Sequence, residues 1–317
     1  MGSDAARLVS IGEIVAEIVA EDRGAGFRKP IRLQGPYPSG APAIFIDQAA
    51  RLGHPAGLIS CVGDDDFGWI NIERLRRDGV DTSAVRVHPD HPTGTAFVRY
   101  RETGERDFVF NIRHSAAGHT RIDAAGQTLL DGCGHLHVMG SSLFSPTLVA
   151  EAGQAVRHVK RRGGTVSFDP NVRKELLAVP GMRDALGAML RQCDLFLPSG
   201  PELTLLTEAV SEAGAIGEIL GLGVQAVVVK RGRDGASYHG RNGALHMPAF
   251  PAEEIDPTGA GDCFGATFVT CRLQGRGIED SLRYASASGA RAVGVRGPME
   301  GTSSFAELDA FIAGQGA

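Results

Sequence analysis

Continuous apolar segments alternate with amphipathic segments along most of the chain. The apolar segments end in turns that contain Gly, Pro or Asp, and they span residues 8–12, 56–62, 135–139, 165–168, 195–197 and 226–230. Residues 44–52 and 146–162 carry apolar positions at the spacing of one helix face. Such strands, separated by helices, are typical of a parallel sheet covered on both faces. The pattern therefore predicts a three-layer α/β fold with a central, mostly parallel sheet, whose ligand site lies at the C-terminal ends of the strands.

Two segments have the shorter period of a strand and interrupt this alternation. Residues 95–112 alternate on both sides of residues 102–105, which is typical of a β-hairpin with Gly104 in its turn. A second short alternating segment, residues 27–37, is bounded by Gly and Pro. Together they predict a small β-sheet lid, inserted at about residues 21–37 and 93–113. An open edge and an apolar face on such a sheet also predict a homodimer formed through the lid.

Composition and charge exclude several classes of protein. The chain has 317 residues, 43% of them hydrophobic and 22% charged, which favours one large globular domain over its whole length. The net charge of −5 comes without a basic cluster, so we expect no nucleic-acid partner. No apolar run reaches the roughly 20 residues that span a bilayer, so we expect no membrane insertion.

The N-terminal residues and the cysteines predict a cytoplasmic protein. Residues 1–15 lack the basic region, long apolar stretch and cleavage site of a secretory signal. The cysteines are odd in number, scattered and without a CxxC pair, so we expect buried free thiols rather than disulfides or a zinc site. They are Cys61, Cys133, Cys193, Cys263 and Cys271.

The most informative segment is residues 254–268, EIDPTGAGDCFGATF. The small residues Gly259, Ala260 and Gly261 predict a tight turn at the start of an apolar helix. Unobstructed backbone N–H groups at a helix N-terminus bind anions, typically phosphate. Asp262 lies in the first turn of that helix and has two interpretations on spacing alone. It caps the helix, or it accepts the proton of a hydroxyl that attacks a phosphoryl group.

This segment resembles the C-terminal signature of the ribokinase-like (PfkB) carbohydrate kinases, Asp-Thr-x-Gly-Ala-Gly-Asp, with Pro257 in the second place. The resemblance implies a ribokinase-like fold and an ATP-dependent sugar kinase. It implies that Asp262 is the catalytic base, in contact with the substrate hydroxyl, and that the three small residues before it form the anion hole. It further implies a monovalent cation, K⁺, bound through backbone oxygens near Asp256 and Thr258.

Residues 38–53 resemble the family's Gly-Gly motif, which closes on the sugar. The resemblance assigns Gly40 and Ala41 to substrate binding. Ser39 stands in place of the first glycine, and Ile44 stands where asparagine is common.

Other segments imply a nucleotide site with magnesium. Residues 168–173 resemble the family's Asp-x-Asn-x-Arg strand end, residues 229–235 its nucleotide loop, and residues 284–297 its adenine-side helix. Where the family has Asn-x-x-Glu, this chain has Ser199 and Glu202, so Glu202 is implied to hold Mg²⁺ through water. The implied nucleotide contacts are Arg173, Ser199, Lys230, Gly232, Gly235, Gly261 and Ser286.

Four polar residues near the implied sugar site have two interpretations each. Glu13 and Glu17 follow the first strand, where the family has an acidic residue that binds sugar hydroxyls. Glu17 fits the position of this acidic residue. The alternative is that its carboxylate is simply solvated at the end of the strand. Arg113 follows the hairpin, where the family discriminates between substrates, and a surface arginine is the alternative. Asp47 is expected to be solvated, and contact with the sugar is the alternative.

Alternatives also stay open for several charged residues elsewhere. Arg173 binds phosphate or forms an ion pair with Asp169, and Lys230 binds nucleotide phosphate or ends its strand. His135 and His137 face one way on a strand, a geometry that can bind metal. Without a third ligand at a suitable spacing, we expect them to be core or supporting residues.

The resulting functional hypothesis is an ATP-dependent kinase that transfers the γ-phosphate to a primary hydroxyl of a small sugar. Glu17 and the segments 38–48 and 110–116 look most like kinases of ketohexoses, tagatose or fructose. The alternative is a 2-keto-3-deoxygluconate kinase, in which Arg113 would bind the carboxylate of the sugar acid. A third hypothesis is a non-catalytic, sugar-binding regulator. A dinucleotide-dependent oxidoreductase and a Walker-type nucleoside triphosphatase are rejected, since neither GxGxxG after the first strand nor GxxxxGK[ST] occurs.

Overall fold

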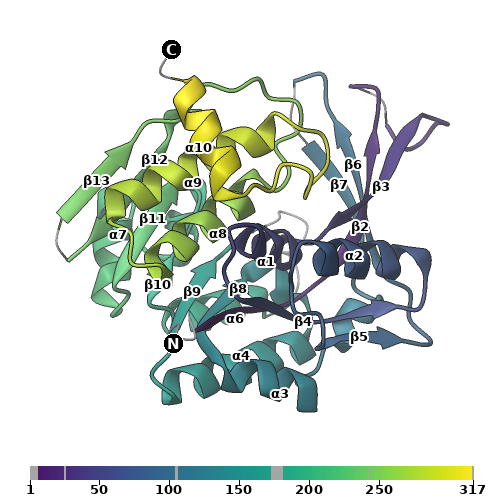
Figure 1. The fold of residues 1–317 in the computed structure, drawn as a ribbon, viewed down its shortest axis with the longest axis horizontal. Helices are drawn as coiled ribbons and strands as arrows, with labels where there is room; N and C mark the ends of the chain where they lie inside the picture. The colour runs from purple at the N-terminus through teal and green to yellow at the C-terminus, as the bar shows by residue number, and fades with distance from the viewer. Residues whose placement is uncertain (1–5, 25, 104–105, 173–180, 242, 316–317) are drawn as a thin grey trace.

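The structure is a computed structural model that describes residues 6–24, 26–103, 106–172, 181–241 and 243–315. Gly104, the expected hairpin turn, lies outside the described residues. A nine-stranded sheet crosses the molecule, and a four-stranded sheet projects beside it (Figure 1). In spatial order the large sheet consists of β13 (Gly243–Met247), β12 (Ala236–Gly240), β11 (Ala226–Lys230), β10 (Leu195–Phe196), β9 (Thr165–Asp169), β8 (Cys133–Met139), β1 (Arg7–Ile11), β4 (Ala56–Gly63) and β5 (Val85–His88).

The large sheet is parallel from β5 to β11, and β12 and β13 continue it as an antiparallel hairpin. Successive side chains of the central strands enter cores on opposite faces. On β11, Val227 and Val229 join one hydrophobic cluster and Val228 joins the other. Both faces are buried, which explains why these strands are continuously apolar in the sequence.

Helices cover both faces and confirm the predicted three-layer α/β fold (Figure 1). One face packs against α3 (Ala124–Asp131), α4 (Pro146–Arg161), α6 (Met182–Leu190) and α7 (Glu212–Gly221), and the other carries α1 (Ala41–Arg51), α2 (Asp66–Arg77), α8 (Ala260–Leu273), α9 (Ile278–Val293) and α10 (Phe305–Gly314). Short 3₁₀ turns are η1 (Ala116–His119), η2 (Gly140–Phe144), η3 (Gly200–Glu202), η4 (Thr204–Leu206) and η5 (Gly232–Asp234). Among the described residues, no helix is both long and apolar enough to cross a membrane.

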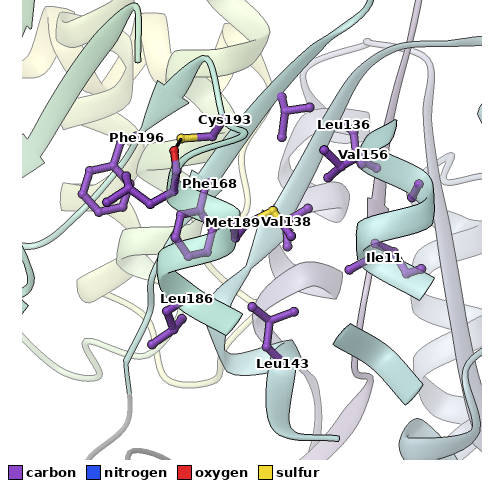
Figure 2. Close-up of a cluster of buried hydrophobic side chains, with 14 of the residues drawn as sticks. Ile11, Leu136, Val138, Leu143, Val156, Phe168, Leu186, Met189, Cys193 and Phe196 are labelled. Carbon is purple, nitrogen blue, oxygen red and sulfur yellow. Dashed lines mark hydrogen bonds between the residues drawn. The ribbon is translucent and has the colours of Figure 1, made fainter. Parts of the chain in front are cut away.

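The core beneath α4 and α6 holds the central strands in place. Figure 2 shows Val138 of β8 and Phe168 of β9 facing Val156 of α4 and Met189 of α6. Burying each such side chain stabilises the fold by roughly 1.5–3 kcal/mol. The five cysteines are buried and free, as expected. This packing fixes the strand ends, where the polar residues of the site begin.

The small sheet has the order β3 (Leu33–Ser39), β2 (Val15–Ala20), β6 (Gly94–Tyr100) and β7 (Arg106–Asn111). β6 and β7 pair antiparallel, which confirms the hairpin. β2 also belongs to the small sheet, although it lies outside the ranges expected for the lid. Only three residues separate β2 from β1, so the sequence does not distinguish the two apolar strands from a single segment. Dimerisation stays a prediction; Leu33 and Val109, on the edge strands, are exposed.

Candidate active site

Polar side chains gather where parallel strands of the large sheet end. Glu13 follows β1 and Ser141 follows β8, while Asp169 and Lys230 are the last residues of β9 and β11. Because parallel strands end at one edge, these four residues belong to a single site, as the strand pattern predicts. Helix α8 begins at the same edge with Asp262 in its first turn.

The turn before α8 is built for close approach of an anion. Gly259 has a φ of 82°, and a Cβ on it would lie 2.3 Å from the carbonyl oxygen of Pro298, so no other residue fits there. At Gly261, the atom nearest to an added Cβ would be Nζ of Lys230, at 3.6 Å. The first backbone N–H groups of α8 and a lysine ammonium therefore lie together, which favours a negatively charged ligand.

Asp262 separates two cavities. The first, which we call the inner pocket, lies between the small sheet and the large domain, and Glu13, Glu17, Gly40 and Asp262 line it. The second, the outer groove, runs along the other side of the turn and is also lined by Asp262. The Asp262 side chain is buried, being only 7% exposed. A carboxylate in this position faces a molecule in either cavity, which is the placement a proton acceptor between two substrates needs.

The floor of the inner pocket is acidic and hydrogen-bonded. Oε1 of Glu13 accepts a hydrogen bond from Ser141 Oγ at 2.8 Å, and its Oε2 accepts one from Ser142. Oε2 of Glu17 accepts a weaker one from Ser39 Oγ at 3.4 Å. Ser39, the residue that replaces a family glycine, thus orients the glutamate that sequence reasoning assigned to substrate. Both glutamates are buried.

The small sheet forms the roof of the inner pocket. Ala96, Phe108 and Phe110 line it from above, opposite Gly40 and Ile44. Gly40 has a φ of 114°, and a Cβ on it would lie 2.6 Å from the carbonyl oxygen of Glu13, so a larger residue would push these two backbone segments apart. The free space is about 50 Å³, room for only a few water molecules. A ligand the size of a sugar needs more room than this, so the pocket has to widen when such a ligand binds.

Two hydrogen bonds tie the small sheet to the segment just before α8. The Tyr100 hydroxyl donates to Oδ1 of Asp256 at 2.8 Å, and Arg106 Nη1 donates to Oγ1 of Thr258 at 2.9 Å. The Asp256 carboxylate also accepts from the backbone N–H groups of Thr258 (3.0 Å) and Gly297 (3.1 Å). Burial, together with the negative charge of Asp256, raises the pKa of Tyr100, so its hydroxyl keeps the proton it donates.

Replacement of Tyr100 by phenylalanine should loosen this tie. A hydrogen bond to a charged group contributes about 1.5–3 kcal/mol, and the variant also leaves one Asp256 oxygen with one donor fewer. We expect a lower melting temperature and a severalfold higher KM for the molecule that binds in the inner pocket, with little change in the KM for the ligand of the outer groove. Tyr37→Phe, a tyrosine of the same sheet, is the control. An unchanged KM and melting temperature in Tyr100→Phe would show that the tie does not hold the small sheet.

A buried ion pair lies at the inner end of the outer groove. Lys230 Nζ forms an ion pair with Oδ2 of Asp169. Burial raises the pKa of Asp169 to about 6, although the Lys230 charge opposes the rise. Burial acts to lower the pKa of Lys230, but the charges of Asp169, Glu202 and Asp262 outweigh it and raise the pKa. The ammonium therefore stays charged, with three carboxylates around it.

Glu202 is held rigidly beside this pair. Its Oε1 accepts from the backbone N–H of Val172 at 2.6 Å, and its Oε2 accepts from both the backbone N–H and the Oγ of Ser199 at 2.7 Å. Ser199, which stands where the family has asparagine, thus forms a capping box with Glu202. The carboxylate lines the groove, and its remaining lone pairs suit the water shell of a hard cation such as Mg²⁺.

Farther from Lys230, two glycines and Ser286 line the outer groove. Gly232 and Gly235 line it with φ of 55° and 85°, and a Cβ on Gly235 would lie 2.1 Å from the Met247 carbonyl oxygen. Ser286 Oγ is buried and, among the described residues, has no hydrogen-bond partner. Ser286 lines the groove, so a polar ligand bound there could supply the missing partner.

Two of the residues discussed from the sequence line neither cavity, and a third is not described. Arg113 is exposed and is not among the residues that line either cavity. Arg173 lies outside the described residues. The expectation that Asp47 is solvated is wrong: it is fully buried, accepts from Thr302 Oγ1 at 2.9 Å and pairs with Arg74 at 3.6 Å. Burial raises the pKa of Asp47 to about 7.

The histidines of β8 are buried, as expected. His135 lies within hydrogen-bond distance of Thr165 Oγ1 (2.7 Å) and Ser167 Oγ (2.8 Å), and His137 within 2.7 Å of the same serine. Burial lowers the pKa of His135 to about 4, so it stays neutral at pH 7. Sequence reasoning missed Ser141, Asn171 and the roof phenylalanines as pocket residues. Only the position of Ser141 and Asn171 just after strands gave any signal for them.

The arrangement of helix α8, the acidic pocket and the groove agrees with comparisons to known proteins. The family model described as pfkB family carbohydrate kinase matches residues 5–304. The chain belongs to this family. This carbohydrate kinase is 33% identical to a fructokinase of Klebsiella pneumoniae, over 83% of this chain and 87% of the relative. It is 29% identical to the 2-dehydro-3-deoxygluconokinase of Bacillus subtilis, over 97% and 95%.

Solved structures share the whole fold with this kinase. A protein of Escherichia coli provisionally named ribokinase II, solved with ATP and Mg²⁺, is 50% identical over 97% of this chain and 99% of its own, with a TM-score of 0.92. A fructokinase double mutant of Vibrio cholerae, solved with fructose, ADP and a potassium ion, is 25% identical over 98% and 99%, with a TM-score of 0.83. These likenesses confirm the ribokinase-like fold and the transfer of phosphate to a sugar hydroxyl.

Proposed function

We propose that this kinase transfers the γ-phosphate of ATP to a primary hydroxyl of a ketohexose, tagatose or fructose. The observation that carries the proposal is that Asp262 lines both the acidic inner pocket and the outer groove. The sugar occupies the pocket and ATP the groove, so the carboxylate lies between the attacking hydroxyl and the phosphoryl group. Relatives solved with fructose, and with ATP and Mg²⁺, support both ligands.

In the proposed reaction, Asp262 and the residues around it have separate roles. Asp262 accepts the proton of the sugar hydroxyl as its oxygen attacks phosphorus, with ADP as the leaving group. The N–H groups of the turn, at Gly259, Ala260 and Gly261, donate to the transferring phosphoryl oxygens. Lys230, beside this turn, adds positive charge. Mg²⁺, held through water by Glu202, would neutralise charge on the ATP phosphates.

An uncharged sugar fits the inner pocket better than a sugar acid. Glu13, Glu17 and Asp262 line it, and none of its described lining residues is a lysine or an arginine. A substrate carboxylate would meet like charges there, which disfavours binding. Sugar hydroxyls, in contrast, donate well to carboxylates. Arg113, the proposed clamp for a sugar acid, is exposed.

The decisive assay measures coupled ADP release with MgATP and tagatose, fructose, ribose, 2-keto-3-deoxygluconate and adenosine. We expect kcat/KM to be highest for a ketohexose and at least roughly tenfold lower for the sugar acid, which corresponds to about 1.4 kcal/mol. Glu17→Gln should weaken ketohexose use, and Arg113→Ala should leave it unchanged. Turnover of the sugar acid alone, lost in Arg113→Ala, would reassign Arg113 as its clamp. No turnover on any sugar would favour the non-catalytic regulator.

A monovalent cation beside Asp256 and Thr258 is part of the proposal. The Asp256 carboxylate accepts hydrogen bonds from the backbone N–H groups of Thr258 and Gly297. A cation bound to backbone oxygens of these two segments would hold the neighbouring anion hole more rigidly. The potassium ion in the Vibrio cholerae fructokinase structure supports this site.

A further inference from the structure

Three histidines from different segments meet at the base of the small sheet, away from both cavities. His88 is the last residue of β5, His91 precedes β6, and His119 is the last residue of η1. Each offers one ring nitrogen, and these nitrogens all lie within 4.8 Å of one another. The ring centroids are 4.0–4.9 Å apart, so the three imidazoles pack against one another. All three are half-buried and thus open to ions from solvent.

We propose that His88, His91 and His119 bind a late first-row divalent metal ion, with Zn²⁺ as the best match. Imidazole nitrogens suit Zn²⁺, Cu²⁺ and Ni²⁺, whereas Mg²⁺ prefers oxygen ligands. Three histidines with water as the fourth ligand make a complete tetrahedral zinc site. The site is therefore distinct in chemistry from the magnesium site at Glu202.

The surroundings of two rings prepare them as ligands. Nδ1 of His91 lies 3.3 Å from the carbonyl oxygen of His114. Because a carbonyl only accepts, Nδ1 carries the proton and Nε2 presents its lone pair, as in most histidine–metal sites. A ring nitrogen of His119 lies within 4.8 Å of those of the other two histidines, and a metal would bind the neutral form of the ring.

His88 is held by a bond that a metal can displace. Its Nδ1 accepts from the backbone N–H of Asp90 at 3.1 Å. Asp90 is exposed, so water can replace the ring as partner of this N–H when a metal takes the Nδ1 lone pair. The exchange costs little, since the donor is never left buried and unpaired.

The three residues lie where a bound ion would act on the small sheet. His91 comes two residues before Thr93, which joins the start of β6 to the large domain through Gly63 N (2.9 Å) and Asp65 Oδ2 (2.7 Å). His119 lies on the segment that leaves β7. A metal would thus link the chain entering the β6–β7 hairpin to the chain leaving it, and would stiffen the base of the small sheet.

The test is zinc binding by the chelator-treated full chain, measured by calorimetry and by competition with a chromophoric zinc indicator. Wild type should bind one Zn²⁺ at this site with micromolar or tighter affinity. His88→Asn, His91→Asn and His119→Asn should each weaken binding at least roughly tenfold. His114→Asn, the matched exposed control, contributes only its backbone carbonyl and should bind as wild type. Cobalt substitution should give the visible absorption of a tetrahedral ion in wild type alone.

Two further readouts separate a real site from scattered weak binding. Zinc should raise the melting temperature of wild type and of His114→Asn, but not of the three variants. Without zinc, all variants should fold and phosphorylate sugar as wild type does, because none lies in the pocket or groove. If wild type fails to bind zinc, or if the three variants bind it as tightly as wild type does, the proposal is wrong.

Discussion

Replacement of Asp262 by asparagine is expected to remove nearly all sugar phosphorylation and leave the protein folded. Asparagine keeps the shape of the side chain but cannot accept the hydroxyl proton, and a general base contributes about 10²–10⁴-fold to rate. The helix should lose only about 0.3–1 kcal/mol from the missing first-turn charge. The measurement is kcat from coupled ADP release, alongside a thermal melt and a direct measurement of ATP binding, which should persist.

A matched control separates catalysis from helix stabilisation. Asp280 lies in the first turn of α9, the helix that packs against α8, but it is exposed and lines neither cavity. Asp280→Asn should lose a similar amount of helix stabilisation and keep full turnover. If Asp262→Asn retained activity within tenfold of wild type, Asp262 would be a helix cap and the catalytic assignment would fail.

Local sequence predicted the elements whose form depends on neighbours in the chain. The continuously apolar strands, the β6–β7 hairpin and the turn at Gly259 each follow from residues that are adjacent or nearly so. The position of Asp262 followed as well, since a helix first turn lies next to its own anion-binding N–H groups. Strand ends such as that before Glu13 then placed the site at one edge of the sheet.

The sequence could not predict contacts between distant segments. In the sequence, Asp47 is an ordinary polar position of a helix, yet the fold packs Thr302 and Arg74 against it and buries it completely. The same holds for the histidine cluster, because His88 and His119 are brought together only when β5 and η1 meet. Roles for such residues depend on topology, which a local pattern does not contain.

The pairing of Lys230 with Asp169 is another such contact. The sequence left two alternatives for Lys230, nucleotide phosphate or a strand end, and offered Asp169 only as a partner for Arg173. It did not predict an ion pair between Lys230 and Asp169. Asp169 ends β9 and Lys230 ends β11, so the two meet across β10 only once the sheet order is fixed. The pair lines the groove proposed for ATP, which makes its removal informative for stability and for activity.

Replacement of Lys230 by methionine is expected to destabilise the protein in a pH-dependent way and to weaken ATP use. The two side chains are 15% and 2% exposed, so Asp169 would be left as an uncompensated buried charge, which costs about 3–5 kcal/mol. Burial already raises the pKa of Asp169 from 3.8 to about 6 with Lys230 present, and loss of the ammonium should raise it further. ATP KM should rise with the loss of positive charge beside the anion hole.

The sign of the pH effect follows from protonation of Asp169. Below about pH 4 this carboxyl is protonated in the folded and the unfolded chain, so the missing ammonium costs least there. As pH rises through 6 and above, the unfolded chain has released the proton, while the folded variant must hold it or bear a buried charge. The difference in free energy of unfolding between wild type and Lys230→Met should therefore widen from pH 5 to pH 8.

Two variants decide whether the buried charge is the cause. Lys230→Met combined with Asp169→Asn removes both charges and should recover much of the stability lost at pH 8, although not the ATP affinity. Lys160→Met breaks the Lys160–Asp194 pair, whose side chains are 39% and 16% exposed, and should cost only about 0–1 kcal/mol with little pH dependence. Chemical denaturation at pH 5 and pH 8 gives each value. A Lys230→Met penalty that is equal at both pH values, or is not relieved in the double variant, would mean that lost packing rather than an unpaired Asp169 destabilises the protein.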